Sequence, residues 1–302
     1  MIKMPIPLIK LLRPEQWTKN LFIFLPAFFN GQLLNISILP PCIVVFIAFS
    51  FAASFIYCFN DLYDMEADKL HPEKCKRPVA AGMVSNKMVY TVMAVCFLLS
   101  ISTLFIFDGK EKYGPMSLIL FYYTMNIAYC VKLKKYAIID VIVIAFGFVI
   151  RVWIGGTVSK IWLSEWIIIM TFLLALFLAF AKRRDDVVLR QNTGISHRNN
   201  TTQYNLEFMN QILTVVATIT IVAYIMFTLS PDVIERFRSR HLYFTAIFVL
   251  MGIVRYLQIA IVDLKSGSPT RVLLNDRFIQ CCIVGWIALF SFIVYGGFPD
   301  GF

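Results

Sequence analysis

Three aspartates and an asparagine stand at the end of a long apolar stretch, in the segment "FNDLYDMEAD". On a helical wheel, one arc of about 100° contains Tyr57, Asn60, Asp61, Asp64 and Asp68. Three carboxylates and an amide oxygen on one stripe repel one another unless a cation neutralises them. Mg²⁺ prefers such hard oxygen ligands, usually one or two carboxylates together with substrate phosphates. We therefore expect a Mg²⁺ site here, and the alternative is a solvated acidic helix end.

Basic and turn-forming residues follow directly, in "HPEKCKRP". Pro72 and Pro78 are expected to break the helix. Lys74 and Arg77 are then placed to meet phosphate oxygens across from the metal, because charged donors bind phosphate strongly.

A second charged stripe occurs later, in "LAFAKRRDDVVLR". Lys182, Arg183, Asp186 and Arg190 stand at offsets 0, 1, 4 and 8, which are the offsets of the four residues of the acidic stripe. The match indicates a duplicated site in which one half holds metal and the other holds anions directly. The alternative is a cluster of cations that anchors the helix at the membrane surface.

Two arginines lie inside apolar stretches, where a charge is costly and usually functional. Arg151 follows Asp140 by eleven residues and returns to nearly the same helix face. Arg255 precedes Asp263 by two turns. Each arginine is expected either to pair with a carboxylate or to bind a substrate phosphate.

The elements that must position these residues are membrane helices. Of the 302 residues, 59% are hydrophobic and 15% are charged, which is too apolar for an ordinary soluble domain. The apolar runs are continuous rather than alternating, which argues against a membrane barrel. We expect an all-α integral membrane protein with a single domain over 1–302. About nine spans are long enough to cross the bilayer, and they lie near 20–36, 40–60, 88–107, 115–131, 137–157, 164–181, 210–229, 241–262 and 278–297.

Lysine and arginine distribution predicts the orientation. With the N-terminus in the cytoplasm, about 20 of these residues lie inside and about 6 outside, as the positive-inside rule requires. The net charge of +10 then follows from topology and suits anionic lipid or a phosphorylated substrate, so it does not call for nucleic acid. We expect a multi-pass protein of the cell (inner) membrane whose site faces the cytoplasm.

Several segments together resemble the UbiA superfamily of intramembrane prenyltransferases, and within it the decaprenyl-phosphate phosphoribosyltransferase branch. They are "RPEQWTKN", "NDLYDMEADKLHPEKCKRPVAAG", "AYCVKLKKYAIIDV", "IRVWIGG", "AKRRDD", "VRY" and "NDR", in the order of that branch. The basic KRxxD motif sets this chain apart from the aromatic prenyltransferases, which carry an acidic DxxxD there.

The resemblance implies a UbiA-type bundle and an enzyme of glycan or cell-wall precursor synthesis. Its reaction would join 5-phosphoribosyl 1-diphosphate to a polyprenyl phosphate and release pyrophosphate. Asp61, Asp64 and Asp68 would be catalytic and, with Asn60, would hold Mg²⁺ on the diphosphate. The remaining expected substrate-binding residues are Lys19, Tyr57, Lys74, Arg77, Lys134, Asp140, Arg151, Lys182, Arg183, Asp186 and Arg255.

Two other functions remain open from the sequence. An aromatic polyprenyltransferase would use a prenyl diphosphate and a phenolic acid, and the basic second motif argues against it. A transporter for an anionic solute would need a polar path, which the apolar outer halves of the spans do not supply. A homo-oligomer is compatible with any of these functions.

Overall fold

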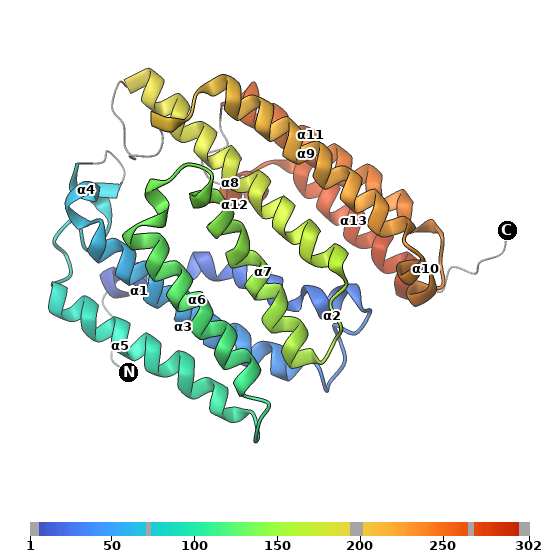
Figure 1. Cartoon of the computed structure of the whole chain (residues 1–302), viewed down its shortest axis with the longest axis horizontal. Helices are drawn as coiled ribbons and strands as arrows, with labels where there is room; N and C mark the ends of the chain where they lie inside the picture. Colours follow the sequence, from blue (N-terminus) through green and yellow to red (C-terminus); the bar gives the residue numbers. More distant parts are fainter. Residues whose placement is uncertain (1–5, 71–73, 194–201, 265–268, 296–302) are drawn as a thin grey trace. The chain divides into compact units, whose positions relative to one another are not determined.

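The computed structural model describes residues 6–70, 74–193, 202–264 and 269–295. Every regular element in these ranges is a helix, so the predicted all-α class is confirmed. The chain divides into two compact units, 1–163 and 164–302, which are described separately below. Figure 1 labels the helices along the chain.

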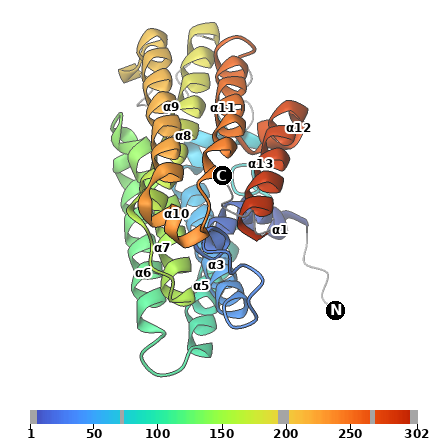
Figure 2. The same cartoon turned by 90° about the vertical axis from the view of Figure 1, so that its right-hand side faces the viewer.

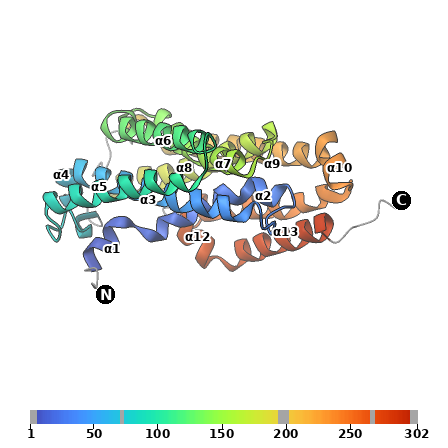
Figure 3. The ribbon, with the colours of Figure 1, turned by 90° about the horizontal axis from the view of Figure 1, so that it is seen from below.

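The first unit is arranged around one long helix, α3, which packs against α1, α5, α6, α7 and the 3₁₀ segment η1. Figure 3 shows α1 and α5 beside α3. The α-helices of this unit are α1 (Ile6–Leu12), α2 (Leu25–Phe29), α3 (Leu39–Tyr63), α4 (Met65–Lys69), α5 (Asn86–Thr103), α6 (Tyr113–Val131) and α7 (Ile139–Ser159). Its 3₁₀ segments are η1 (Pro14–Phe24), η2 (Lys74–Lys76), η3 (Leu104–Ile106) and η4 (Leu133–Lys135).

The second unit is a chain of packed helices in which α8 lies on α9, α9 on α11, and α11 on α13 (Figure 2). Asn205 caps α9 by accepting a hydrogen bond from the backbone amide of Phe208 at 2.7 Å, which satisfies one donor at the helix start. The elements are α8 (Glu165–Thr193), α9 (Leu206–Leu229), α10 (Pro231–Phe237), η6 (His241–Thr245), α11 (Ala246–Ile261), α12 (Pro269–Asn275) and α13 (Arg277–Tyr295).

Seven helical stretches among the described residues are long and apolar enough to cross a membrane. They are Leu39–Tyr63, Asn86–Ile106, Ile139–Ser159, Glu165–Gln191, Leu206–Leu229, His241–Ile261 and Arg277–Val294. Each matches one of the predicted spans, and the chain is a multi-pass integral membrane protein. The predicted span at 115–131 is α6, a helix of 19 residues. The total of nine spans stays a prediction.

The predicted span at 20–36 is not one continuous helix. The 3₁₀ segment η1 ends at Phe24, α2 ends at Phe29, and turns follow. Pro26 lacks an amide donor and occupies the first turn of α2, where no donor is needed. Gly31 then adopts φ 69°, a left-handed conformation that ends the helix.

A close backbone approach fixes η1 on α7. A Cβ atom added at Gly155 would lie 2.0 Å from the carbonyl oxygen of Ile23. Only glycine fits at this point, so η1 can press its backbone against α7. The segment that carries Lys19 and Asn20 is therefore positioned by a residue far along the chain.

Candidate active site

The acidic stripe keeps its helical register across the junction between α3 and α4. Asp64 caps both helices, and its amide donates to the carbonyl of Asn60 at 2.9 Å. The amide of Asp68 donates to the carbonyl of Asp64 at 2.8 Å. These bonds to the fourth preceding residue hold Asn60, Asp61, Asp64 and Asp68 on one side of the junction.

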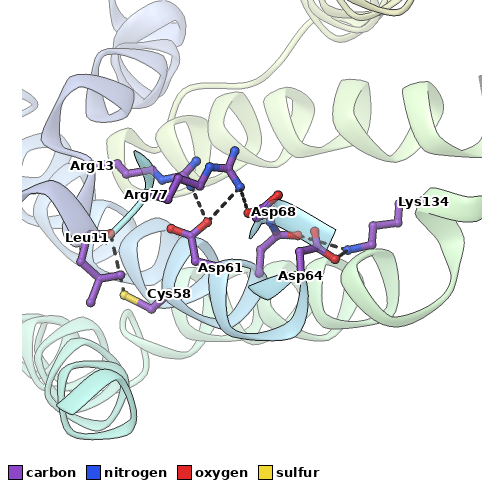
Figure 4. Close-up of polar contacts among 9 residues, drawn as sticks. Leu11, Arg13, Cys58, Asp61, Asp64, Asp68, Arg77 and Lys134 are labelled. Atoms are coloured by element: carbon purple, nitrogen blue, oxygen red, sulfur yellow. Dashed lines mark hydrogen bonds and ion pairs between the residues drawn. The ribbon is translucent and has the colours of Figure 1, made fainter. Parts of the chain in front are cut away.

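Two arginines neutralise Asp61 and Asp68 (Figure 4). Arg77 reaches Asp68 at 2.6 Å and Asp61 at 3.1 Å, so it joins the two carboxylates. Arg13 reaches the same oxygen of Asp61 at 2.5 Å. The aspartates are buried, with 1% of Asp61 and 4% of Asp68 exposed, which strengthens these charge-assisted bonds.

Lys134 neutralises Asp64, the aspartate of the stripe that the two arginines do not bind. Its ammonium lies 2.5 Å from Asp64 Oδ1 and 3.4 Å from the amide oxygen of Asn60 (Figure 4). It also lies 5.0 Å from the centre of the Tyr63 ring, within cation–π distance. The 3₁₀ turn η4, which follows α6, delivers this lysine to the end of α3.

Ser54 positions the N-terminal segment that carries Arg13. Its hydroxyl donates to the carbonyl of Leu12 at 2.8 Å and accepts from the indole nitrogen of Trp17 at 3.0 Å. Arg13 lies between these two anchors with φ 50°, and its guanidinium carbon lies 5.1 Å from the centre of the Tyr57 ring. The predicted site residue Tyr57 therefore lies beside the cation that binds Asp61.

The donor set of the stripe suits a hard divalent cation. Asp61 Oδ2 is buried and has no hydrogen-bond partner among the described residues, so one carboxylate oxygen is available for a further ligand. Within the described residues, no group of three or more acidic, histidine or cysteine side chains is arranged to hold an ion by itself. An ion here would use one or two carboxylates and complete its shell with oxygens of a bound substrate, as Mg²⁺ usually does.

A second group of polar residues lies on α7 and η1, within the first unit. Arg151 is 5% exposed and donates to the amide oxygen of Asn20 at 2.8 Å. Asp140 lies in the first turn of α7, about 16 Å along the helix from Arg151. The shared helix face therefore does not bring Asp140 and Arg151 into contact, because the axial distance is too great.

Lys74 lies in η2, and its carbonyl accepts a hydrogen bond from the amide of Arg77 at 2.9 Å. This turn places both predicted phosphate ligands on the short segment that follows the acidic stripe.

The basic stripe lies on α8 in the second unit. Arg183 is buried, with 1% of its surface exposed, and pairs with Asp186 at 2.9 Å. Lys182 is exposed. Arg184, which the sequence analysis did not select, is equally buried and donates to Asn210 at 2.7 Å and to the carbonyl of Ala260 at 2.5 Å. From its sequence position next to the stripe, Arg184 could not be distinguished from a cation that anchors the helix at the membrane surface.

Arg255 on α11 pairs with a carboxylate, one of its two expected roles. It binds Asp276 at 2.7 Å and lies 4.0 Å from Asp263, the expected partner. The bond from Arg255 lowers the pKa of Asp276 below its usual range. The main partner is therefore the aspartate of the "NDR" segment.

The comparison with protein families decides where the chain belongs. A model of the UbiA prenyltransferase family matches residues 21–282. The chain belongs to the UbiA prenyltransferase family. The expected family is thereby confirmed, and the match includes both charged stripes.

Two relatives align with most of the length of this UbiA family member. The chain is 31% identical over 302 residues to a protein of Mycolicibacterium smegmatis named decaprenyl-phosphate phosphoribosyltransferase, covering 95% of this chain and 92% of the relative. A protein of Corynebacterium glutamicum with the same name is 29% identical over 296 residues, covering 95% and 86%.

Solved structures share the UbiA fold. A UbiA homolog from Archaeoglobus fulgidus bound to GPP and Mg²⁺ superposes with a TM-score of 0.68 at 18% identity, covering 96% of this chain and 99% of that one. The apo structure of a UbiA homolog from Aeropyrum pernix K1 gives 0.67 at 12% identity, covering 92% and 98%. At these identities the likeness establishes the fold.

Proposed function

We propose that this protein transfers a 5-phosphoribosyl group from 5-phosphoribosyl 1-diphosphate to a polyprenyl phosphate in a Mg²⁺-dependent reaction. The relatives that share about 30% identity over most of the chain carry the name of such an enzyme, which supports this reaction. The observation that carries the proposal is the acidic stripe itself, where three carboxylates are matched by Arg13, Arg77 and Lys134.

This pairing suits a diphosphate that arrives with a metal. Asn60, Asp61, Asp64 and Asp68 would hold Mg²⁺, which when bound would neutralise the diphosphate as a Lewis acid. With the carboxylates holding the ion, Arg13, Arg77 and Lys134 would be free to donate hydrogen bonds to phosphate oxygens. The same side chains therefore balance the charge of the site before and after the donor binds.

The transfer itself exchanges one bond at the anomeric carbon of the ribose. A phosphate oxygen of the lipid bonds to this carbon while the bond to the diphosphate oxygen breaks, and pyrophosphate leaves with the electron pair. Positive charge develops on the sugar, as in other glycosyl transfers. The acceptor phosphate is already an anion, so the residues need only orient it and no strong general base is required.

We assign the binding of the remaining phosphate groups of the donor to Lys74, Lys182 and Arg183. This assignment rests on their charge and spacing, since charged donors bind phosphate oxygens strongly. Tyr57 and Asp140 are assigned to the walls of the substrate site, and Asp186 to the orientation of Arg183, which it binds at 2.9 Å.

We place the site at the cytoplasmic face of the inner membrane, where a water-soluble donor is available. The excess of lysine and arginine in the segments around 61–87 and 182–209 supports this orientation. A cysteine introduced at Asn35, in a background without native thiols, should react with an impermeant maleimide in intact cells, whereas one at Asn86 should be shielded. The opposite labelling would contradict the orientation.

One assay separates the proposed function from its rivals. Purified protein in detergent is incubated with Mg²⁺, ribose-labelled 5-phosphoribosyl 1-diphosphate and polyprenyl phosphates of several lengths. Label should enter the lipid phase and should not do so when EDTA replaces Mg²⁺. Product from a prenyl diphosphate and a phenolic acid, without any product from the labelled donor, would favour an aromatic prenyltransferase. Uptake of a phosphorylated solute into sealed vesicles, without transfer, would favour a transporter.

A further inference from the structure

Arg151 is a buried cation in the middle of a membrane-spanning helix. It lies on α7, is 5% exposed, and among the described residues it donates to two neutral oxygens. Its Nε donates to Asn20 Oδ1 at 2.8 Å and its Nη1 to the carbonyl of Gly147 at 2.6 Å. A charge in such a place is costly unless an opposite charge accompanies it.

Within the described part of the chain, no carboxylate supplies that opposite charge. Asp140, the acidic residue of the same helix, is about 16 Å away along the axis. The aspartates of the acidic stripe are matched by other cations, among them Arg77 and Lys134. The region around Arg151 therefore carries an excess of positive charge.

The guanidinium is nevertheless held firmly in place. Its carbon lies 4.6 Å from the ring centre of Phe49, 5.3 Å from that of Tyr122 and 5.5 Å from that of Phe148. These three aromatic rings surround it at cation–π distance. A side chain held this way, from three elements of the fold, is oriented before any ligand arrives.

Asn20 is fixed in turn by a hydrogen bond to α3. Its amide nitrogen donates to the hydroxyl of Ser50 at 2.9 Å, and that hydroxyl donates to the carbonyl of Phe46 at 2.7 Å. Asn20 is fully buried, and this chain of bonds turns its oxygen toward Arg151. The network therefore serves to orient a cation, and it does not neutralise one.

Lys19, the neighbour of Asn20 on η1, adds a second cation. It is half-buried, and within the described residues it forms no ion pair. Burial and the positive charges of Arg151 and Arg13 lower its pKa to about 8. An anion bound at Arg151 would offset the cost of burying this cation and would weaken the repulsion that lowers the pKa of Lys19.

We infer that Arg151 and Lys19 form a second phosphate site, separate from the acidic stripe, which receives a phosphate monoester. A phosphate would supply the negative charge that the described residues do not give Arg151, and an arginine can bind two phosphate oxygens at once. Lys19, which precedes the Arg151 partner Asn20 in η1, would add a second positive charge. This inference rests on the proposed function, which supplies two such groups: the phosphate of the polyprenyl acceptor and the 5-phosphate of the donor. Both have the same chemistry, and the experiment below tells them apart.

The test uses Arg151→Met, which keeps the length and apolar body of the side chain, and Lys87→Met as a matched control. Lys87 is an exposed lysine at the start of α5 in the same unit. Thermal unfolding in detergent is measured alone, with farnesyl phosphate, and with ribose 5-phosphate. One of the two probes should raise the midpoint of the wild type and of Lys87→Met and should leave Arg151→Met unchanged.

Kinetics then identifies the source of the phosphate. Arg151→Met should raise the Michaelis constant of either the lipid acceptor or the donor by about tenfold or more, because a charged hydrogen bond is lost. The Mg²⁺ requirement should stay unchanged. An effect on the lipid assigns the site to the acceptor, and an effect on the donor assigns it to the 5-phosphate.

A purely structural role predicts a different pattern. Arg151→Met would then unfold at a lower temperature without ligand, yet both probes would shift its midpoint as in the wild type, and that result would overturn the inference. If Arg151→Met does not fold, Arg151→Lys keeps the charge but loses the planar fork. An unchanged probe shift and unchanged Michaelis constants in Arg151→Lys would equally reject the site.

Failure of the proposed function gives another signature. In that case the wild type transfers no phosphoribosyl group, while the probe shifts still report on the phosphate site. If neither farnesyl phosphate nor ribose 5-phosphate raises the unfolding midpoint of the wild type, the phosphate site is rejected, whether or not the protein is active.

Discussion

Asp61 and Asp64 lie three residues apart on the acidic stripe, but they should respond differently to the same substitution. Asp61 is 1% exposed and receives bonds from Arg13 at 2.5 Å and Arg77 at 3.1 Å. Asp64 has a side chain that is 26% exposed and one ion pair, with Lys134 at 2.5 Å. Asp61→Asn and Asp64→Asn each remove one negative charge and keep the shape of the side chain.

The expected cost follows from burial. Removing one member of a buried ion pair costs about 3–5 kcal/mol, because the other charge is left uncompensated. An ion pair with solvent access is worth about 0–1 kcal/mol. Asp61→Asn should therefore lower the free energy of unfolding by about 3 kcal/mol or more, whereas Asp64→Asn should lower it by about 1 kcal/mol at most.

Both variants should lose phosphoribosyl transfer, since each removes a predicted metal ligand. The measurements are chemical unfolding in detergent micelles and the lipid-extraction assay on the same preparations. Near-normal activity of Asp64→Asn at limiting Mg²⁺ would refute the metal site. Equal stability of the two variants would refute the division of the stripe into a buried and an accessible part.

Three further predictions concern the basic residues and the backbone. Changing Lys182 and Arg183 together to Asp should raise the Michaelis constant of the donor well over tenfold, because one or two charged hydrogen bonds to phosphate are lost. An unchanged Michaelis constant would mean that this pair only anchors the helix at the membrane surface. Folding lowers the pKa of Lys19 from 10.5 to about 8, so the charged form of this lysine destabilises the folded state below pH 8. As the pH rises from 8 toward 10.5, the unfolding free energy of the wild type should therefore increase relative to that of Lys19→Met. A difference that does not change with pH would contradict the burial of this ammonium. Gly155→Ala should destabilise the protein by about 1–3 kcal/mol or more, since its Cβ would lie 2.0 Å from a backbone oxygen of Ile23, whereas Gly252→Ala, with its nearest contact at 3.7 Å, should unfold at a temperature close to that of the wild type.

The membrane helices could be predicted from the sequence because their signal is local. Continuous apolar runs predicted the seven spans that the structure describes, and α3 ends at Tyr63, close to the predicted end at residue 60. The segment 20–36 was predicted as one continuous span because hydropathy carries no information about backbone conformation. Pro26 and Gly31 interrupt the helix, although the segment remains apolar.

The acidic stripe could be predicted because its members share one helix face. The partners of the stripe could not, since they come from elsewhere in the chain. Lys134 reaches Asp64 from 70 residues away, and Arg13 reaches Asp61 from 48 residues away. Arg13 stands in the segment "RPEQWTKN", but nothing in the sequence connects it to Asp61.

The partners of the two intramembrane arginines could likewise not be predicted from the sequence. A charged residue in a span predicts that something must accompany it, but not what. Arg255 pairs with Asp276, and Arg151 binds the neutral oxygens of Asn20 and Gly147. Only the tertiary structure separates these two cases, because Asp276 and Asn20 lie on other elements than the arginines they bind.

The central claim is that the phosphoribosyl group, and not the diphosphate, is transferred to the lipid at the acidic stripe. The most direct test uses a donor labelled with carbon-14 in the ribose and phosphorus-32 in the β-phosphate, with a polyprenyl phosphate and Mg²⁺. Carbon-14 should enter the lipid phase while an equal amount of phosphorus-32 appears as pyrophosphate in water, and Asp64→Asn should stop both. Phosphorus-32 in the lipid phase, or release of pyrophosphate without labelled lipid, would contradict the account.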